Sequence, residues 1–222
     1  MTPFPFDVVA FDLDGTLADT APDLAASLNH ALARLERAAV TEDAVRGMIG
    51  HGGRALLKRA LGADEAEADQ LIARALPLFL EHHAANICVG TRCYPGIEAA
   101  MDALEARGVK LAICTNKTGR MTHLLIEALG WEGRFAAIVC ADTLTVRKPD
   151  PLPLLEAIAR AGGGRAVFVG DSITDADTAR AAALPFVAVG FGYCDRPVAQ
   201  LGADAVIDSY AELIGALERL SA

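Results

Sequence analysis

The amino-acid sequence predicts an α/β fold, in which helices surround a parallel sheet and an all-helical segment is inserted after the first strand. In residues 95–220, short apolar runs alternate with amphipathic segments of helical length, which is typical of βαβ units. In residues 17–86, apolar residues recur at helical spacings, and no run rich in β-branched residues occurs. The two patterns therefore predict a sheet core and a separate helical unit.

The first strand is predicted at residues 7–11, where the run is apolar throughout. The segment Thr20–Asp23 resembles a capping box with proline in the first helical turn, and the helix that follows has one leucine face, made of Leu24, Leu28, Leu32 and Leu35. Thr41 is expected to cap a second helix that is broken by the glycines of residues 50–53. Two further helical patterns extend to about residue 86, and Pro77 favours a kink in the last of them.

Beyond the helical unit, strands and helices are expected in turn. The predicted strands are residues 109–114, 135–140, 165–169, 186–189 and 205–207, and the predicted helices are residues 95–107, 119–129, 151–161, 175–183 and 210–220. Right-handed crossovers then give a Rossmann-like parallel sheet core. We assign residues 1–16 and 87–222 to this core and residues 17–86 to a helical cap domain. Because ligands bind at the carboxyl ends of the strands, the cap is placed to act as a lid.

Composition narrows the classes of partner. The chain has 222 residues, of which 53% are hydrophobic and 22% are charged, and its formal net charge is -9. This balance is typical of a globular protein, and it disfavours nucleic acid or an anionic membrane surface as a partner. No apolar run approaches the roughly 18 residues that span a bilayer. We expect a small phosphorylated metabolite as partner, no nucleic acid, no membrane, and a monomer or homodimer.

The five cysteines show neither a C-x-x-C motif nor a Cys/His cluster. They are expected to be thiols in a reducing compartment. Residues 1–5 contain no basic segment and no long apolar stretch, so no signal peptide is expected. The predicted location is therefore cytoplasmic.

Polar residues follow the predicted strands at four places. Asp12 and Asp14 come after the first strand, Thr115-Asn116-Lys117 after the second, Lys148-Pro149 opens a later loop, and Gly170-Asp171-Ser172 leads to Asp175. In a doubly wound sheet these positions converge on one crevice. Burying two carboxylates side by side is costly, and such a pair usually serves a cation or a reaction. The four segments therefore predict one active site.

These four segments match, in order, the four motifs of the haloacid dehalogenase-like hydrolases, and the match covers essentially the whole chain. Within that superfamily the sequence resembles the phosphatases that have a helical cap between motifs one and two. The segments Asp19–Leu24, Ile49–Gly53 and Lys148–Leu154 are similar to those of the phosphoglycolate phosphatases. The resemblance implies a Mg²⁺-dependent phosphatase that acts on a small phosphate monoester, most closely 2-phosphoglycolate, through an aspartyl-phosphate intermediate.

The resemblance also implies roles for residues of the core. Asp12 would be the nucleophile and a Mg²⁺ ligand, while Asp14 would act as general acid and base and bind the metal through its backbone carbonyl. Asp171 would complete the protein ligands of Mg²⁺. Asp175 would bind the metal indirectly, through water, or orient Lys148.

Phosphate contacts are implied for the remaining motif residues. Thr115 and Asn116 would donate hydrogen bonds to phosphate oxygens, Lys148 would neutralise their charge, and backbone N–H groups around Leu13 would help to hold the phosphate. Thr115 and Lys148 are thus counted with the catalytic residues. In the cap, substrate contacts are expected from His51, Gly52, Gly53 and Arg54.

Plainer interpretations remain open for several residues. Asp175 and Thr115 are also good helix caps, and His51 is equally well placed as the solvated end of a cap helix. Lys117 is interpreted as a surface or rim charge, and contact with the substrate is the alternative for it. Structural or solvent-facing positions are expected for His30, His82, His83 and Cys114.

Other functions are compatible with the same core motifs. Asp14 distinguishes the chain from the dehalogenases themselves, which have no leaving alkoxide to protonate. A pyrophosphatase, a sugar-phosphate phosphatase and a β-phosphoglucomutase-like enzyme remain alternatives, because substrate choice lies in the cap. A catalytically inactive phosphate-binding scaffold is the alternative outside the enzymes, although such a protein is expected to have lost at least one of the core motif residues.

Overall fold

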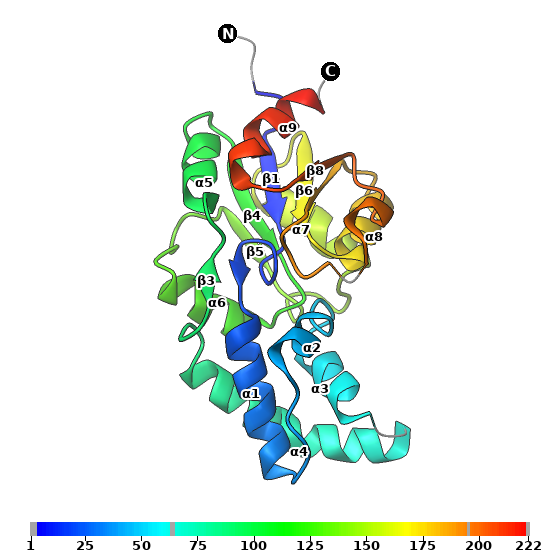
Figure 1. Ribbon diagram of the computed structural model, residues 1–222. Helices are drawn as coiled ribbons and strands as arrows, with labels where there is room; N and C mark the ends of the chain where they lie inside the picture. The colour runs from blue at the N-terminus through cyan, green and yellow to red at the C-terminus, as the bar shows by residue number, and fades with distance from the viewer. Residues whose placement is uncertain (1–3, 63–64, 195, 221–222) are drawn as a thin grey trace.

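The computed structural model describes residues 4–62, 65–194 and 196–220, and its centre is a six-stranded parallel sheet (Figure 1). The strands have the order β5-β4-β1-β6-β7-β8, and every neighbouring pair is parallel. Their bounds are β1 Val8–Phe11, β4 Lys110–Cys114, β5 Ala137–Val139, β6 Ala166–Gly170, β7 Phe186–Val189 and β8 Ala205–Ile207. All six were predicted from sequence, and the α/β fold class is confirmed.

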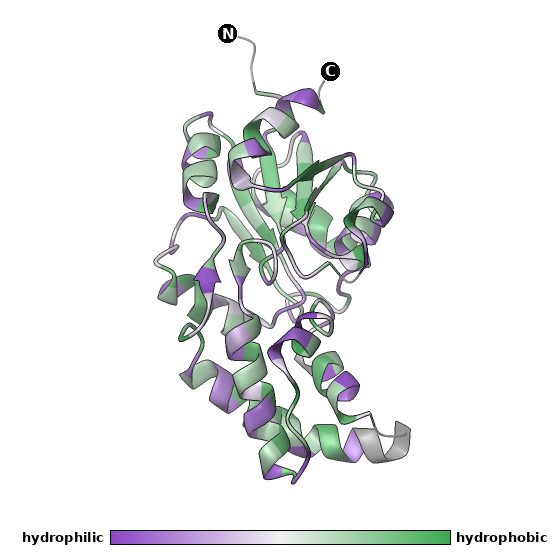
Figure 2. Cartoon of the chain, viewed as in Figure 1, coloured by the Kyte–Doolittle hydropathy of each residue, from purple (hydrophilic) through white to green (hydrophobic). Residues whose placement is uncertain are grey.

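Helices cover both faces of the sheet. On one face α5 (Ile97–Glu105), α6 (Gly119–Ala128) and α9 (Leu213–Arg219) pack on a cluster that includes Val9 and Phe11 of β1. On the other face α7 (Leu152–Arg160) and α8 (Ile173–Ala181) pack on a cluster that includes Val8 and Ala10. Successive strand residues point to opposite faces, so a strand covered on both sides is apolar at every position, as the hydropathy colouring shows (Figure 2).

The remaining helices form a separate unit beyond the carboxyl ends of the strands (Figure 1). It consists of α1 (Ala21–Arg34), α2 (Glu42–Arg46), α3 (Gly53–Leu61) and α4 (Glu65–Ala85). Leu28, Leu57, Ile72 and Phe79 lie in its own hydrophobic core. The side chain of Thr41 caps α2 as predicted, and Pro77 lies inside α4 without ending it. The domain boundaries at residues 16 and 86 stay predictions.

Two short strands join the helical unit to the sheet core. β2 (Ala18–Asp19) and β3 (Arg92–Cys93) pair antiparallel, so the outgoing and returning segments of the chain lie side by side. Sequence analysis did not predict this ladder, because two residues are too few to show a period. It fixes the point at which α1 leaves the core.

The capping box predicted at residues 20–23 is wrong. Thr20 does occupy the N-cap of α1, but its side chain makes no capping hydrogen bond. Its hydroxyl donates instead to Asp14 Oδ1 at 2.7 Å. The Thr20 hydroxyl therefore binds Asp14 and does not cap α1.

Among the residues that the structure describes, no helix combines the length and the apolarity that crossing a membrane requires. The expectation of no signal peptide was based on residues 1–5, and residues 1–3 lie outside the described residues. Residues 195, 221 and 222 of the predicted core also lie outside them.

Candidate active site

Asp12 lies at the centre of the site, directly after β1. Its backbone N–H donates to the carbonyl of Val169 at 2.9 Å, which continues the pairing of β1 with β6 by one residue. The side chain is buried, and its Oδ1 lies 3.0 Å from Lys148 Nζ. Burial raises the pKa of Asp12 to about 6, although the charge of Lys148 acts in the opposite direction.

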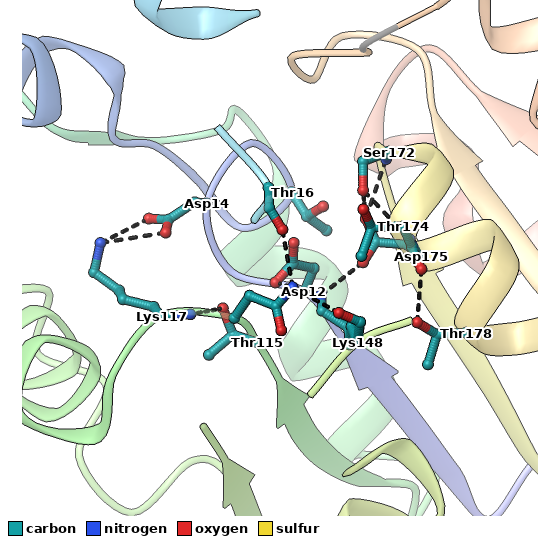
Figure 3. A network of polar contacts seen from close by, with 12 residues as sticks. Asp12, Asp14, Thr16, Thr115, Lys117, Lys148, Ser172, Thr174, Asp175 and Thr178 are labelled. Carbon is teal, nitrogen blue, oxygen red and sulfur yellow. Dashed lines mark hydrogen bonds and ion pairs between the residues drawn. The ribbon is translucent and has the colours of Figure 1, made fainter. Parts of the chain in front are cut away.

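Lys148 connects Asp12 to Asp175 (Figure 3). Its ammonium donates to Asp175 Oδ1 at 2.6 Å, and its side chain is 1% exposed. Burial alone would lower the pKa of Lys148, but the charges of Asp12 and Asp175 raise it well above its ordinary value. A lysine outside such a motif is usually a solvated surface residue, and this burial excludes that interpretation for Lys148.

Asp175 combines two of the roles that the sequence left open. Its Oδ2 accepts hydrogen bonds from the backbone N–H and the hydroxyl of Ser172, at 3.1 and 2.6 Å, and so closes a capping box at the start of α8. Its Oδ1 faces Lys148. The helix cap thus holds the carboxylate that orients the lysine.

Asp171 is held by the loop that follows β1 and by the loop that follows β7. Thr16 Oγ1 donates to Asp171 Oδ1 at 2.8 Å, and the N–H of Tyr193 donates to Oδ2 at 2.9 Å. Gly15 has a φ of +84°, and a Cβ there would collide with Asp171 Oδ2. Glycine is therefore required at this position.

The acidic cluster has the chemistry of a magnesium site. Asp12, Asp171 and Asp175 each offer a carboxylate oxygen, and these three atoms lie within 4.8 Å of one another. Burial, together with the charges of Asp175 and Asp12, raises the pKa of Asp171 well above its ordinary value. Three carboxylates are buried together, and the ammonium of Lys148 pairs with two of them, Asp12 and Asp175. With all three ionised, two negative charges would remain to be balanced. A divalent cation with oxygen ligands fits this set.

Asp14 points away from the acidic cluster, toward Lys117 (Figure 3). Lys117 Nζ lies 2.9 Å from Oδ1 and 3.3 Å from Oδ2, and Thr20 Oγ1 donates to Oδ1. Burial by itself would raise the pKa of Asp14, but Lys117 and the hydrogen bond from Thr20 lower it. The lysine side chain is 5% exposed, so the interpretation of Lys117 as a rim charge is wrong.

The other residues expected to bind phosphate follow β1 and β4. Thr115 is buried, and its side chain lies beside Asp12 (Figure 3). Leu13 is also buried and adjoins Asp12 along the chain. The Nδ2 of Asn116 donates to the carbonyls of Gly50 and Lys148, at 3.0 and 3.1 Å. A hydrogen bond from Asn116 to phosphate therefore stays a prediction.

A cavity opens from Asp12 and Asp14 toward the helical unit. Gly52, Gly53 and Arg54 line it, as expected for substrate contacts, and so does His83 of α4. His51 does not line it. Its Nδ1 lies 3.3 Å from the hydroxyl of Thr174 at the start of α8, so His51 contacts the core beside the cavity.

The glycines of the loop before α3 have a packing function. Gly52 has a φ of +84°, and a Cβ there would lie 3.0 Å from the carbonyl oxygen of Asn116. A Cβ on Gly53 would lie 3.0 Å from the ring of Phe79. This loop can approach the core and α4 only because these positions lack side chains.

Tyr193 was missed by sequence analysis, since it lies in a loop without a motif. Its hydroxyl accepts from the N–H groups of Thr20 and Ala21, at 2.6 and 2.8 Å, and donates to Asp19 Oδ1 at 3.0 Å. Arg46 of α2 pairs with Asp19 at 2.8 Å and lies over the Tyr193 ring. The core loop thus fastens the start of the helical unit.

Asp23, in the segment from Asp19 to Leu24, has a structural role. It is buried in α1, and its two oxygens accept from the N–H groups of Gly90 and Thr91, both at 2.8 Å. The outgoing and returning segments are therefore tied together by one carboxylate.

Comparisons with known proteins agree with this arrangement. The family model described as haloacid dehalogenase-like hydrolase matches residues 9–189. A phosphoglycolate phosphatase of Mesorhizobium japonicum is 51% identical over 213 residues, which cover 93% of this chain and 92% of the relative. One of Agrobacterium fabrum is 45% identical, with 98% of this chain and 95% of the relative covered.

A solved structure shows the same fold. The crystal structure of a "predicted phosphoglycolate phosphatase" from Haemophilus somnus 129PT has a TM-score of 0.88 and 30% identity, and the match covers 95% of this chain and 97% of that one. The family model spans most of the chain and the relatives match nearly all of it. The chain therefore belongs to the haloacid dehalogenase-like hydrolases, as a phosphoric monoester hydrolase similar to the phosphoglycolate phosphatases.

Proposed function

We propose that this protein is a cytoplasmic, Mg²⁺-dependent phosphatase that hydrolyses 2-phosphoglycolate through an aspartyl-phosphate on Asp12. The observation that carries the proposal is the buried cluster of Asp12, Asp171 and Asp175 around Lys148, with Asp14 two residues beyond Asp12. The names of the relatives support the choice of substrate.

The divalent cation would be held by Asp12, Asp171 and the backbone carbonyl of Asp14, with Asp175 acting indirectly. It supplies positive charge that offsets the repulsion between a carboxylate nucleophile and a phosphate dianion. The ammonium of Lys148 contributes to the same end, because it lies 3.0 Å from the Oδ1 of Asp12.

In the first step a carboxylate oxygen of Asp12 attacks phosphorus, and the bond from phosphorus to the ester oxygen breaks. Asp14, which is ionised beside Lys117 in the substrate-free site, must first take up a proton from water. It then gives that proton to the departing oxygen, so glycolate leaves as an alcohol. In the second step Asp14 takes a proton from water, whose oxygen attacks the phosphorus of the aspartyl-phosphate. Phosphate is released and Asp12 is regenerated. Thr115, whose side chain lies beside Asp12, would donate to a phosphate oxygen.

The proposed cap domain, residues 17–86, supplies the outer wall of the cavity through Gly52, Gly53 and Arg54. Closing this wall over the substrate would exclude water during the first step. Substrate choice would then depend on the shape and charge of the wall.

The test is a comparison of phosphate release from 2-phosphoglycolate, pyrophosphate, glucose 6-phosphate and an aryl phosphate, each with Mg²⁺ and with EDTA. We expect the highest kcat/KM for 2-phosphoglycolate and no turnover in EDTA. A higher kcat/KM for another substrate would contradict the proposed specificity. A folded protein without Mg²⁺-dependent turnover of any substrate would contradict the proposed reaction.

A further inference from the structure

The cavity between the catalytic carboxylates and the helical unit is small and mostly apolar. Its volume is about 180 Å³, and its outer wall includes Leu24, Leu56 and Phe79. Typical sites for drug-sized ligands measure roughly 300–1,000 Å³, so this one suits a small molecule. Recognition there depends on the few polar groups that the wall contains.

Lys117 is the buried cation of this cavity. Among the described residues that line it, Arg54 and Arg147 are also cationic, but both are exposed. The Arg54 guanidinium, moreover, pairs with Asp69 at 2.7 Å on the surface. The ammonium of Lys117 lies inside, and both of its hydrogen bonds go to one carboxylate, that of Asp14. A buried ammonium requires such a negative partner.

His83 supplies an independent sign that the cavity receives a polar ligand. The residue is 2% exposed, and its Nε2 has no hydrogen-bond partner among the described residues. Its Nδ1 lies 3.4 Å from Ser27 Oγ. Buried polar atoms are normally satisfied, and this one belongs to a side chain that lines the cavity. Burial and the charge of Lys117 lower the pKa of His83 to about 3, so the imidazole is neutral and adds no charge.

The position of Lys117 relates it to the leaving group. A general acid lies within about 2.6–3.2 Å of the oxygen that it protonates, and Lys117 Nζ lies 2.9 Å from Asp14 Oδ1. The ammonium is therefore within about 6 Å of the departing oxygen. A substrate carboxylate attached one carbon from the departing oxygen can therefore lie between that oxygen and the Lys117 ammonium. The phosphoryl group that is transferred lies next to Asp12 instead.

We propose that Lys117 is the anion-binding residue for the leaving group: it exchanges the carboxylate of Asp14 for a substrate carboxylate attached one carbon from the ester oxygen. This inference rests on the proposed function, because it takes Asp14 as the residue that reaches the ester oxygen. The exchange replaces one ion pair by another, so the buried ammonium never lacks a partner. It also frees Asp14 from its ion pair at the moment when the ester oxygen needs it.

The test compares two pairs of compounds that differ only in the carboxylate. Binding is measured by calorimetry with Mg²⁺ for 3-phosphonopropionate and for propylphosphonate, which are not hydrolysed. Turnover is measured for 2-phosphoglycolate and for 2-hydroxyethyl phosphate, whose leaving group is uncharged. The proteins are the wild type, Lys117→Met, Lys117→Arg and, as the matched control, Lys110→Met, which changes an exposed lysine at the opposite end of β4.

We expect the wild type and Lys110→Met to prefer each carboxylate compound by at least about 30-fold, the size of a buried charge contact. Lys117→Met should reduce that preference to less than about 3-fold, because it weakens binding of the carboxylate compound far more than binding of propylphosphonate, and Lys117→Arg should keep part of the preference. Should Lys117→Met not fold, Lys117→Gln takes its place. A wild type without preference, a preference that survives loss of Lys117, or an equal loss for both compounds would overturn the inference.

The two proposals fail in different ways. Binding that prefers the carboxylate in a wild type that does not hydrolyse 2-phosphoglycolate would contradict the proposed function and support the subsite. Hydrolysis of 2-phosphoglycolate and 2-hydroxyethyl phosphate with equal kcat/KM would support the proposed reaction and overturn the subsite.

Discussion

Asp175 Oδ1 accepts a hydrogen bond of 2.6 Å from Lys148 Nζ, and neither side chain is more than 1% exposed. The other oxygen of Asp175 is fixed by Ser172 at the start of α8. The capping interaction at the start of α8 thus sets the position of the Lys148 ammonium. Because the pair is buried, removal of Lys148 leaves Asp175 without its counter-ion, and removal of Asp175 leaves Lys148 with the Asp12 carboxylate alone.

For Asp175→Asn we therefore expect lower stability and lower kcat together. The amide would present a donor to Ser172 or to Lys148, both of which also donate, at a cost of about 1–3 kcal/mol. Lys148 would lose its fixed position, and kcat should fall by at least about tenfold. Urea unfolding and steady-state kinetics measure the two effects. The control is Asp177→Asn, on the exposed side of the same helix, where the carboxylate pairs with Arg180 at the surface. Unchanged kcat in Asp175→Asn would show that Lys148 does not depend on it.

Much of this site was predictable from sequence because it follows from strand geometry. Residues directly after parallel strands share one edge of a sheet, so Asp12, Thr115 and Asp171 are brought together by topology. Spacing within one loop then places Asp14 and Asp175. These expectations need only the approximate ends of the strands, and small errors in those ends do not change them.

The residues that sequence analysis missed depend on packing between the helical unit and the core. Lys117 was interpreted as a surface or rim charge because no local pattern shows that its ammonium meets Asp14 beside a cavity lined by α4 and by the loop before α3. Tyr193 lies in a loop, and its hydroxyl contacts residues more than 170 positions away. Thr20 has the sequence of a cap, but a tertiary hydrogen bond to Asp14 replaces that local role.

Asp12→Asn should abolish turnover, since an amide is not a nucleophile for phosphorus. In the absence of Mg²⁺ its melting temperature should equal or exceed that of the wild type, because a buried like-charge neighbour is removed. Normal activity in this variant would exclude Asp12 as nucleophile. Asp150→Asn, an exposed aspartate after the Lys148 loop, is the matched control and should behave as the wild type does.

The same variant gives a pH dependence. Burial raises the pKa of Asp12 from 3.8 to about 6 in the folded, metal-free protein. The folded state therefore binds this proton more tightly than the unfolded state, and ionisation of Asp12 costs stability as pH rises from about 4 to 6, by up to about 3 kcal/mol. Unfolding of both proteins in EDTA should show the difference: Asp12→Asn gains on the wild type over this window and keeps the gain above it. Parallel stability curves across the window would contradict the raised pKa.

Asp14→Asn separates proton transfer from attack on phosphorus. Alkyl esters need a proton on the departing oxygen, whereas aryl phosphates have a stable leaving group. We therefore expect kcat for 2-phosphoglycolate to fall by about 10²–10⁴-fold. For p-nitrophenyl phosphate the rate of the first step, attack on phosphorus, should fall by much less. Pre-steady-state release of p-nitrophenol measures that rate. An equal loss of the first step on both substrates would argue against Asp14 as the acid.

Tyr193→Phe tests the attachment of the helical unit to the core. The hydroxyl accepts from the N–H groups of Thr20 and Ala21 at the start of α1. Its loss leaves the N–H of Thr20 without that acceptor and the N–H of Ala21 with the longer contact to Asp19 Oδ1 at 3.3 Å, at a cost of about 1–3 kcal/mol. Tyr94→Phe is the matched control, because that ring packs against Phe191 and its hydroxyl makes no hydrogen bond within the part of the chain that the structure describes. Chemical denaturation should place the control within about 0.5 kcal/mol of the wild type. Equal effects of the two variants would assign the role to the ring of Tyr193.

Mg²⁺ should stabilise the wild type against thermal unfolding, because the folded state alone assembles Asp12, Asp171 and Asp175 within 4.8 Å. At a concentration 100 times its Kd, the ion should add about 2.7 kcal/mol. Asp171→Asn removes one of the three carboxylates and keeps an oxygen that can accept from Thr16. Its amide then places a donor against the Tyr193 N–H, at a cost of about 1–3 kcal/mol, while the loss of a buried charge acts in the opposite direction. The variant should therefore fold and lose most of the response to Mg²⁺. Differential scanning calorimetry in EDTA and over a series of Mg²⁺ concentrations measures this without any substrate. A response that persists undiminished in Asp171→Asn would place the cation outside the cluster, and the assignment of Asp12 as a metal ligand would then have to be abandoned with it.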